Sequence, residues 1–182
     1  MGGAPTDVLT RRLRDLEADG IVGRRELEPP ASATVYELTE IGRELEEPLL
    51  ELGRWGLHFY RLEDLPGLVT STLANALRVI LQPPEGTESI TVQLRTGEHT
   101  NWLRVADGST SAGRGEAREP DLVLTGSAPD LIAAIVLGGD AEERIEIEGV
   151  GEALRQLRTM VVLPERLRAE AEASALQLLS SA

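Results

Sequence analysis

Two residue types are missing from this sequence of 182 residues: cysteine and lysine. The absence of cysteine excludes disulfide bonds, thiolate nucleophiles and cysteine metal sites together. All 18 basic residues are arginines, which we attribute to a GC-rich genome rather than to a function. Aromatic residues make up only 3% of the chain, so leucine, valine, isoleucine and alanine must fill its core.

Long apolar runs are also missing. No run approaches the roughly 20 residues that a helix needs to span a bilayer. The first residues lack the charged-then-apolar pattern of a secretory signal peptide. We therefore expect a cytoplasmic protein with no membrane partner.

Residues typical of catalytic and metal sites are sparse. The two histidines, His58 and His99, are far apart in the sequence and are more typical of surface or packing positions. The acidic residues near position 140 lack the regular oxygen spacing of a calcium loop: Asp140, Glu142 and Glu143. No glycine-rich loop continues into a phosphate-binding motif. We expect no catalytic residue, no metal and no cofactor, and therefore no enzyme.

The net charge of −13 argues against indiscriminate binding to nucleic acid, because affinity for DNA depends largely on basic residues that neutralise phosphates. Residues 1–56 contain seven arginines against twelve acidic residues. Five of those arginines are nevertheless close together in the sequence: Arg11, Arg12, Arg14, Arg24 and Arg25. The sequence thus allows a local basic face on an acidic protein.

An amphipathic helix is predicted over residues 7–19. Three leucines at helical spacing form one apolar stripe: Leu9, Leu13 and Leu16. Polar and charged side chains point the other way: Asp7, Thr10, Arg11 and Arg14. Thr6 or Asp7 can cap the start of this helix, and Gly20 can end it in the left-handed conformation with Ile21 closing over it. Taken alone, the pattern also fits an ordinary surface helix.

A hairpin and a second helix are predicted next. Residues 21–28 and 34–38 have the composition of two strands, and residues 29–33 form the turn between them. Thr39 then caps a helix that begins at Glu40 and continues to about residue 57. Pro48 should kink or divide that helix. Its apolar face contains Leu45, Leu49, Leu52 and Trp55.

The runs VLTRRLRDLEADGIVGRREL and YELTEIGRELEEPLLELGRWG, within residues 4–57, resemble the HxlR-type family of bacterial winged-helix transcription regulators. The resemblance implies a homodimer that binds double-stranded operator DNA, with residues 7–19 as the recognition helix and residues 29–33 as the wing. It implies these DNA-binding residues: Thr6, Asp7, Thr10, Arg11, Arg14, Arg24 and Arg25.

Two points in this resemblance leave alternatives open. In the family, two or three helices and a strand precede the recognition helix, whereas this sequence opens almost directly on it. Met1 is then either internal to a longer native chain or the start of a trimmed domain that does not bind DNA. The helix after Thr39 helps to build the dimer in that family, but its leucine and tryptophan face could instead pack on the chain's own core.

The second part of the chain is predicted to follow a boundary at residues 61–67. Helices are expected over residues 68–81, 128–137, 149–161 and from Pro164 onward. Strands are expected over residues 90–94, 101–106, 109–115, 121–125 and 145–148. The predicted fold class is α+β: a partial winged helix-turn-helix over residues 1–60, followed over residues 67–182 by a mainly antiparallel sheet packed with helices.

The segments W.LRVADG, EPDLVLTGSAPDLIAAIVLGG and IEIEGVGEALRQL, within residues 68–162, resemble the sterol-carrier-protein family. The resemblance implies an apolar tunnel between sheet and helices that takes lipids or other hydrophobic molecules. The predicted ligand-pocket residues are Leu77, Val92, Leu94, Leu103, Val105, Leu124, Ile132, Ile135, Leu157 and Met160. These side chains either fill a plain core or leave an apolar cavity, and the scarcity of aromatic residues favours the cavity. Trp102 should face away from Leu103 and Val105.

Together these patterns predict a DNA-binding transcription regulator of the HxlR type, with a C-terminal domain that senses a small hydrophobic ligand or strengthens assembly. A ligand would then act on the winged segment through the joint at residues 57–67. The alternative is a stand-alone module that binds lipids or other hydrophobic small molecules and carries a vestigial winged segment.

Overall fold

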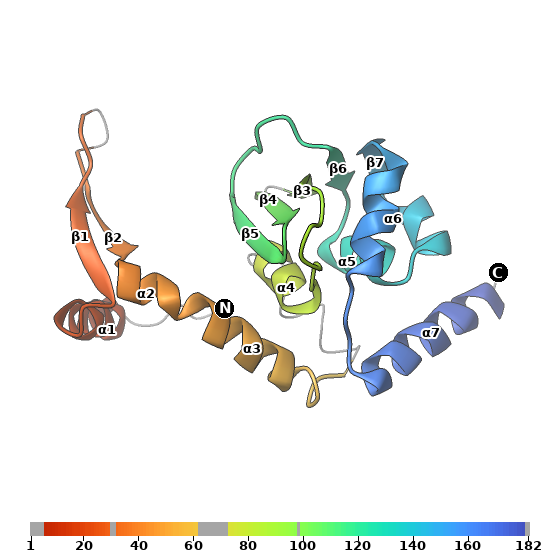
Figure 1. Cartoon of the computed structure of the whole chain (residues 1–182), viewed down its shortest axis with the longest axis horizontal. Helices are drawn as coiled ribbons and strands as arrows, with labels where there is room; N and C mark the ends of the chain where they lie inside the picture. The colour runs from red at the N-terminus through yellow and green to blue at the C-terminus, as the bar shows by residue number, and fades with distance from the viewer. Residues whose placement is uncertain (1–5, 30–31, 62–72, 98, 181–182) are drawn as a thin grey trace. The chain divides into compact units, whose positions relative to one another are not determined.

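The computed structural model describes residues 6–29, 32–61, 73–97 and 99–180. The chain forms two units, Met1–Leu52 and Gly53–Ala182, and Figure 1 labels their helices and strands. The predicted boundary at residues 61–67 lies almost wholly outside the described residues, as does the start of the helix predicted over residues 68–81.

The first unit has the predicted order of helix, hairpin and helix. It contains α1 (Thr6–Ala18), β1 (Val22–Glu26), β2 (Thr34–Leu38), α2 (Glu40–Glu44) and the first residues of α3 (Glu46–Gly56). β1 and β2 pair antiparallel, with Arg24 opposite Tyr36 and Arg25 opposite Val35. β2 has the predicted bounds, whereas β1 is shorter than residues 21–28. The amides that flank β1 form other hydrogen bonds: Ile21 N–H donates to the carbonyl of Leu16, and Leu27 N–H donates to the carbonyl of Ala33.

α1 ends as its sequence predicts. Gly20 has a φ of +73°, a conformation that glycine adopts without a steric penalty. The amide of Ile21 donates to the carbonyl of Leu16 over 2.9 Å, and the amide of Gly20 donates to Glu17 over 3.1 Å. These bonds satisfy carbonyl groups at the end of the helix, so the chain enters β1 within a few residues of leaving α1.

Thr39 and Gly42 join the start of α2 to the end of α1. The hydroxyl of Thr39 accepts from the amide of Gly42 over 3.0 Å, which confirms the predicted helix cap. The same hydroxyl donates to the carbonyl of Gly20 over 2.6 Å. A β-carbon at Gly42 would lie only 2.0 Å from the carbonyl oxygen of Ile21. The Thr-Glu-Ile-Gly sequence at positions 39–42 therefore permits a close approach that a larger residue at position 42 would prevent.

The helix after Thr39 is divided, as Pro48 predicts. α2 ends at Glu44, Leu45 is its C-terminal cap, and α3 begins at Glu46. Proline lacks an amide hydrogen and its ring collides with the carbonyl group four residues earlier, which here belongs to Glu44. The division therefore lies just before Pro48 rather than at it.

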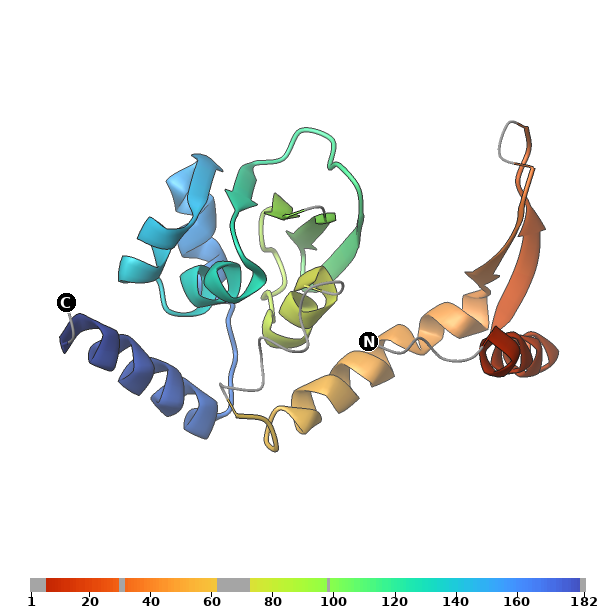
Figure 2. The same ribbon diagram turned by 180° about the vertical axis from the view of Figure 1, so that it is seen from behind.

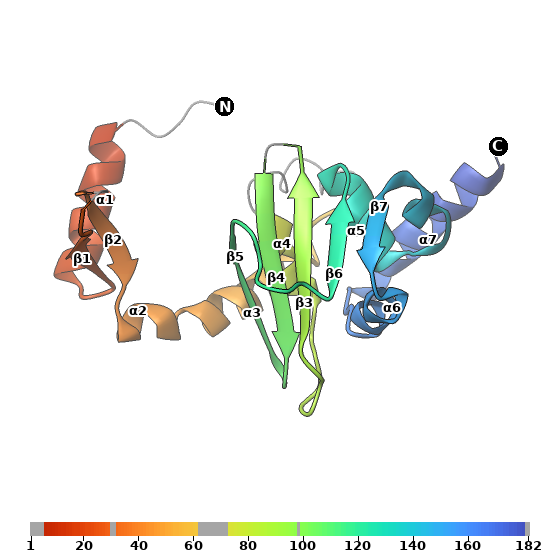
Figure 3. The same cartoon turned by 90° about the horizontal axis from the view of Figure 1, so that it is seen from above.

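The second unit is a five-stranded sheet packed with helices, so the predicted α+β fold class is confirmed. Its elements are α4 (Leu73–Ile80), β3 (Ile90–Thr96), β4 (His99–Ala106), β5 (Ser109–Arg114), β6 (Leu122–Thr125), α5 (Ala128–Val136), the 3-10 helix η2 (Gly139–Arg144), β7 (Glu146–Gly149), α6 (Gly151–Thr159) and α7 (Glu165–Ser180). The strand order is β5-β4-β3-β6-β7, which Figure 3 shows from above. β3 and β6 are parallel, and the other neighbouring pairs are antiparallel.

The connection from β5 to β6, residues 115–121, arches over the face of the sheet opposite to α4 and α5 (Figure 2). The buried amide of Gln93 fixes it in place: Nε2 donates to the carbonyl of Gly115 over 3.2 Å, and Oε1 accepts from the amide of Ala117 over 2.6 Å. Trp102 lies on the same face as Gln93, where a β-carbon at Gly113 would come within 2.6 Å of its indole ring. Trp102 therefore faces away from its buried neighbours in β4, as predicted.

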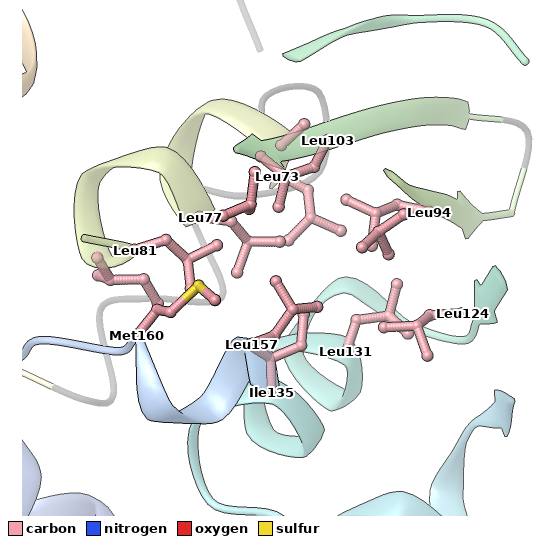
Figure 4. Close-up of a cluster of buried hydrophobic side chains, with 14 of the residues drawn as sticks. Leu73, Leu77, Leu81, Leu94, Leu103, Leu124, Leu131, Ile135, Leu157 and Met160 are labelled. Atoms are coloured by element: carbon pink, nitrogen blue, oxygen red, sulfur yellow. The ribbon is translucent and has the colours of Figure 1, made fainter. Parts of the chain in front are cut away.

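The other face of the sheet carries the main core (Figure 4). Leucine, isoleucine and methionine side chains point toward one another there. They come from α4, α5, α6, the residues directly after α4 and α6, and the central strands: Leu73, Leu77, Leu81, Leu94, Leu103, Leu124, Leu131, Ile135, Leu157 and Met160. The buried members of this cluster are all aliphatic or methionine. The expectation that aliphatic residues fill the core is thus confirmed.

Candidate nucleic-acid interface

The arginines of α1 lie on its exposed side. Arg11, Arg12 and Arg14 are exposed, and within the described residues none of the three forms an ion pair or a side-chain hydrogen bond. Of the other predicted DNA-binding residues of α1, Asp7 is exposed and Thr10 is half-buried. The side chain of Thr6 lies outside what the structure describes. Arg11 and Arg14 therefore have the outward direction predicted for them, and Arg12, for which no direction is predicted, is exposed as well.

The arginines of β1 are exposed but already paired. Arg24 Nη2 lies 3.0 Å from a carboxylate oxygen of Glu17, and its guanidinium carbon lies 5.3 Å from the centre of the Tyr36 ring. The Tyr36 side chain, and after it the Glu17 carboxylate, raise the pKa of Arg24. Arg25 Nε donates to Glu37 over 2.7 Å. The predicted DNA-binding arginines thus separate into an unpaired set on α1 and a paired set on β1.

The apolar stripe of α1 is largely uncovered within the described residues. Leu9 is 54% exposed and Leu16 is 38% exposed, while Leu13 is half-buried. An amphipathic helix normally buries such a stripe against a neighbouring element. The stripe is therefore an open apolar surface of the first unit.

α3 exposes a second apolar stripe. Leu49, Leu52 and Trp55 are 62%, 58% and 61% exposed. Phe59 follows α3 and meets Trp55 edge to face, with ring centres 4.8 Å apart. These side chains recur every three or four residues, so they lie along one side of the helix. These side chains are exposed among the described residues, and both alternatives for this face, a dimer interface and packing on the chain's own core, stay predictions.

The last residues of α3 pack on α4 within the second unit. A β-carbon at Gly53 would lie 3.0 Å from Val79, and Arg54 Nε donates to the carbonyl of Val79 over 3.3 Å. Leu57 is buried in the core cluster. Sequence reasoning missed Gly53 and Arg54. Their close contact with α4 depends on a residue 25 or 26 positions away, which helical spacing does not reveal.

The predicted ligand-pocket residues lie together in the second unit. Nine of them belong to the buried cluster, and Ile132 is half-buried and packs against it. They come from α4, the sheet, α5, α6 and the residue that ends α6. The structure therefore gathers all of them at one place, and their role in binding a ligand stays a prediction.

In the described part of the chain, no three histidine, aspartate or glutamate side chains gather in a way that could hold a metal ion. No helix among residues 6–29, 32–61, 73–97 and 99–180 is both long and apolar enough to cross a membrane.

Some solved structures resemble this chain at low sequence identity. One is the UbiJ-SCP2 ubiquinone synthesis protein, with 12% identity, a TM-score of 0.35, and 72% of this chain and 98% of that chain covered. Another is sterol carrier protein 2 like 2 from Aedes aegypti, with 15% identity, a TM-score of 0.33, and coverage of 65% and 98%. The sec-alkylsulfatase Pisa1 from Pseudomonas sp. matches 51% of this chain and 16% of its own, at 13% identity and a TM-score of 0.42.

The chain has relatives among bacterial regulators. An uncharacterized HTH-type transcriptional regulator of Bacillus subtilis strain 168, YybR, is 47% identical over 49 residues, which are 27% of this chain and 39% of the relative. A second uncharacterized HTH-type transcriptional regulator of that organism, YdeP, is 41% identical over 49 residues, which are 38% of its length. The matches thus span less than two fifths of these curated relatives. Residues 1–64 match the model of the HxlR-like helix-turn-helix family, so the predicted resemblance of this part of the chain to that family is confirmed.

Proposed function

We propose that this protein is a transcription regulator that binds double-stranded operator DNA with α1. The observation that carries the proposal is the outward, unpaired set Arg11, Arg12 and Arg14 on a helix of an otherwise acidic chain. Thirteen residues make α1 about 20 Å long, and the major groove of B-DNA, about 12 Å wide, admits such a helix. Arginine can bind guanine edges there, or the flanking phosphates.

The acidic remainder of the chain shapes how this binding would behave. Carboxylates repel the phosphate backbone, so they oppose contacts that do not depend on sequence. The attraction by α1 is short-ranged and falls as salt screens it. We therefore expect specific binding that weakens steeply as the salt concentration rises.

A duplex selection experiment tests the proposal. The full chain is immobilised, a pool of random duplexes is passed over it at about 50 mM salt, and the retained duplexes are sequenced after several rounds. Fluorescence anisotropy then measures affinity for the enriched duplex between about 50 and 200 mM salt. An enriched motif supports the proposal. A retained pool that stays random, with no measurable affinity at the lower salt, would show that the chain does not read DNA.

The exposed stripe of α3 supports a homodimer. Its leucine and tryptophan side chains form the kind of open apolar face that marks a protein interface. A two-fold dimer would place two α1 helices on half-sites roughly 34 Å apart, so the operator should be palindromic.

We expect light scattering to give twice the chain mass of 19.7 kDa. Changing Leu49 and Leu52 together to glutamate should give the single-chain mass, because two buried charges oppose association. Arg43→Glu alters an exposed residue of α2 outside the stripe and should leave the dimer intact. A double variant that stays dimeric would place the interface elsewhere.

A second function, binding of a small hydrophobic ligand, is favoured by the cluster of buried aliphatic and methionine side chains in the second unit. Such a ligand could regulate the winged segment through α4, because Val79 of that helix contacts Gly53 and Arg54 of α3. Regulation requires that the ligand bind more tightly to one arrangement of the winged segment than to another. If no duplex is bound, the same cluster supports the alternative of a stand-alone module for hydrophobic ligands.

A thermal-shift measurement with palmitate and cholesterol checks this function. A ligand at a hundred times its Kd stabilises the folded state by about 2.7 kcal/mol, which should raise the Tm of the second unit by roughly 5–10 °C. Acetate shares the carboxylate of palmitate without its chain, so it serves as the control and should shift nothing. If neither apolar compound raises the Tm, the cluster is a filled core.

A further inference from the structure

The two arginines of β1 leave the strand on opposite faces of the hairpin. Side chains alternate along a strand, and the register places Arg24 opposite Tyr36 and Arg25 opposite Val35. Arg24 lies on the face that meets Glu17 of α1. Arg25 lies on the other face with Glu37. Each arginine is therefore paired with a carboxylate on its own face of the hairpin.

A paired arginine offers little to a phosphate. Guanidinium and carboxylate together carry no net charge, so a nearby phosphate meets an attraction and a repulsion of similar size. Binding DNA through that arginine requires the ion pair to open and leaves the carboxylate close to the phosphate. No ion pair has to open before Arg11, Arg12 or Arg14 binds a phosphate, because none of them has a carboxylate partner in the described part of the chain.

We propose that the arginines of α1 make the contacts to DNA, whereas Glu17 and Glu37 hold Arg24 and Arg25 away from it. This inference rests on the proposed function and divides its predicted contact residues by role. Arg24 is then a positioning residue: it joins Glu17 of α1 to Tyr36 of β2 and so fixes the angle of α1 on the hairpin. Glu37 acts as an internal competitor of the phosphate backbone for Arg25.

The salt dependence of DNA binding distinguishes an arginine that contacts DNA from one that only positions α1. Each phosphate neutralised adds about 0.9 to the slope of log affinity against log salt. Arg11→Gln or Arg14→Gln should lower the slope by up to about that amount per winged segment, depending on whether each arginine reaches a phosphate or a base. Arg25→Gln should leave the slope unchanged. Arg24→Gln should lower affinity at every salt concentration by a similar factor, because it disturbs the angle of α1 without removing a phosphate contact.

Removal of the competing carboxylate gives the sharpest result. Glu37→Gln should free Arg25, raise the slope by about 0.9 per winged segment and raise affinity about three- to tenfold at about 100 mM salt. The hairpin should stay folded, because an exposed ion pair contributes little to folding stability. Glu26→Gln is the matched control. It removes the same charge from the same hairpin, but Glu26 has no arginine partner among the described residues. It should change affinity less than about twofold and leave the slope as it was.

Anisotropy with the full chain and its selected duplex measures all of these variants, and circular dichroism confirms that each one is folded. The inference is overturned if Arg25→Gln lowers the slope by about 0.9 per winged segment, or if Glu37→Gln and Glu26→Gln have equal effects. Those results leave the proposed function standing. A wild-type chain that binds no duplex overturns the proposed function, and this division of roles with it.

Discussion

Changing Arg11 and Arg14 together to alanine is expected to lower affinity for the selected duplex roughly a hundred- to ten-thousandfold. Loss of one arginine that binds a base edge costs about 1–3 kcal/mol, and the two positions are three residues apart on the exposed side of α1. Neither side chain has a partner in the described residues, so their removal leaves no carboxylate unpaired. The fold should therefore be retained, and the loss should appear in binding alone.

Anisotropy titrations at a fixed salt concentration measure this loss, with circular dichroism melts as the check on folding. Arg114→Ala together with Arg118→Ala is the matched control, because it removes two exposed arginines of the second unit. That variant removes the same two positive charges from the chain and should weaken binding only a few-fold. Unchanged tight binding by the Arg11 and Arg14 variant would mean that α1 is not the helix that enters the groove.

The elements near these arginines could be predicted because their signals are local. Residues 34–38 have the composition of a strand that follows turn residues, and Thr39 offers a cap directly before the first residue of a helix. The dipeptide Asp107-Gly108 predicts a tight turn, and both residues have the positive φ that such a turn needs, 39° and 74°. In each case the deciding interaction lies within a few residues of the chain.

The pairing state of the candidate site could not be predicted in the same way. Whether Arg25 is unpaired depends on Glu37, twelve residues away on the partner strand, and whether Arg24 is unpaired depends on the packing of α1 against β1. The same holds for Gly53, whose role is set by Val79 on another helix. The sequence shows which residues carry charge, but contacts between elements determine which charged side chains are left without an ion-pair partner.

The second large effect is expected at Gly42, where alanine should destabilise the first unit by about 2–4 kcal/mol. Glycine to alanine within a helix usually stabilises by up to about 1 kcal/mol. Here the added carbon would lie 2.0 Å from the carbonyl oxygen of Ile21, so α2 must move away from the end of α1. That movement also opens the Thr39 bonds to Gly20 and Ile21, each worth about 1 kcal/mol. The steric and hydrogen-bond losses exceed the helix gain.

Far-UV circular dichroism and limited proteolysis should show the first unit unfolding at a lower temperature in Gly42→Ala. Tryptophan fluorescence should be unchanged below the main transition, because the chain's two tryptophans, Trp55 and Trp102, both belong to the second unit. Gly23→Ala is the matched control, since its β-carbon meets nothing closer than Thr39 at 3.9 Å, and it should melt like the wild type. Duplex binding should fall with Gly42→Ala and persist with Gly23→Ala, because only the first displaces the elements that orient α1. A Gly42→Ala protein as stable as the Gly23→Ala control would show that the approach of α2 to Ile21 is not needed by the winged segment.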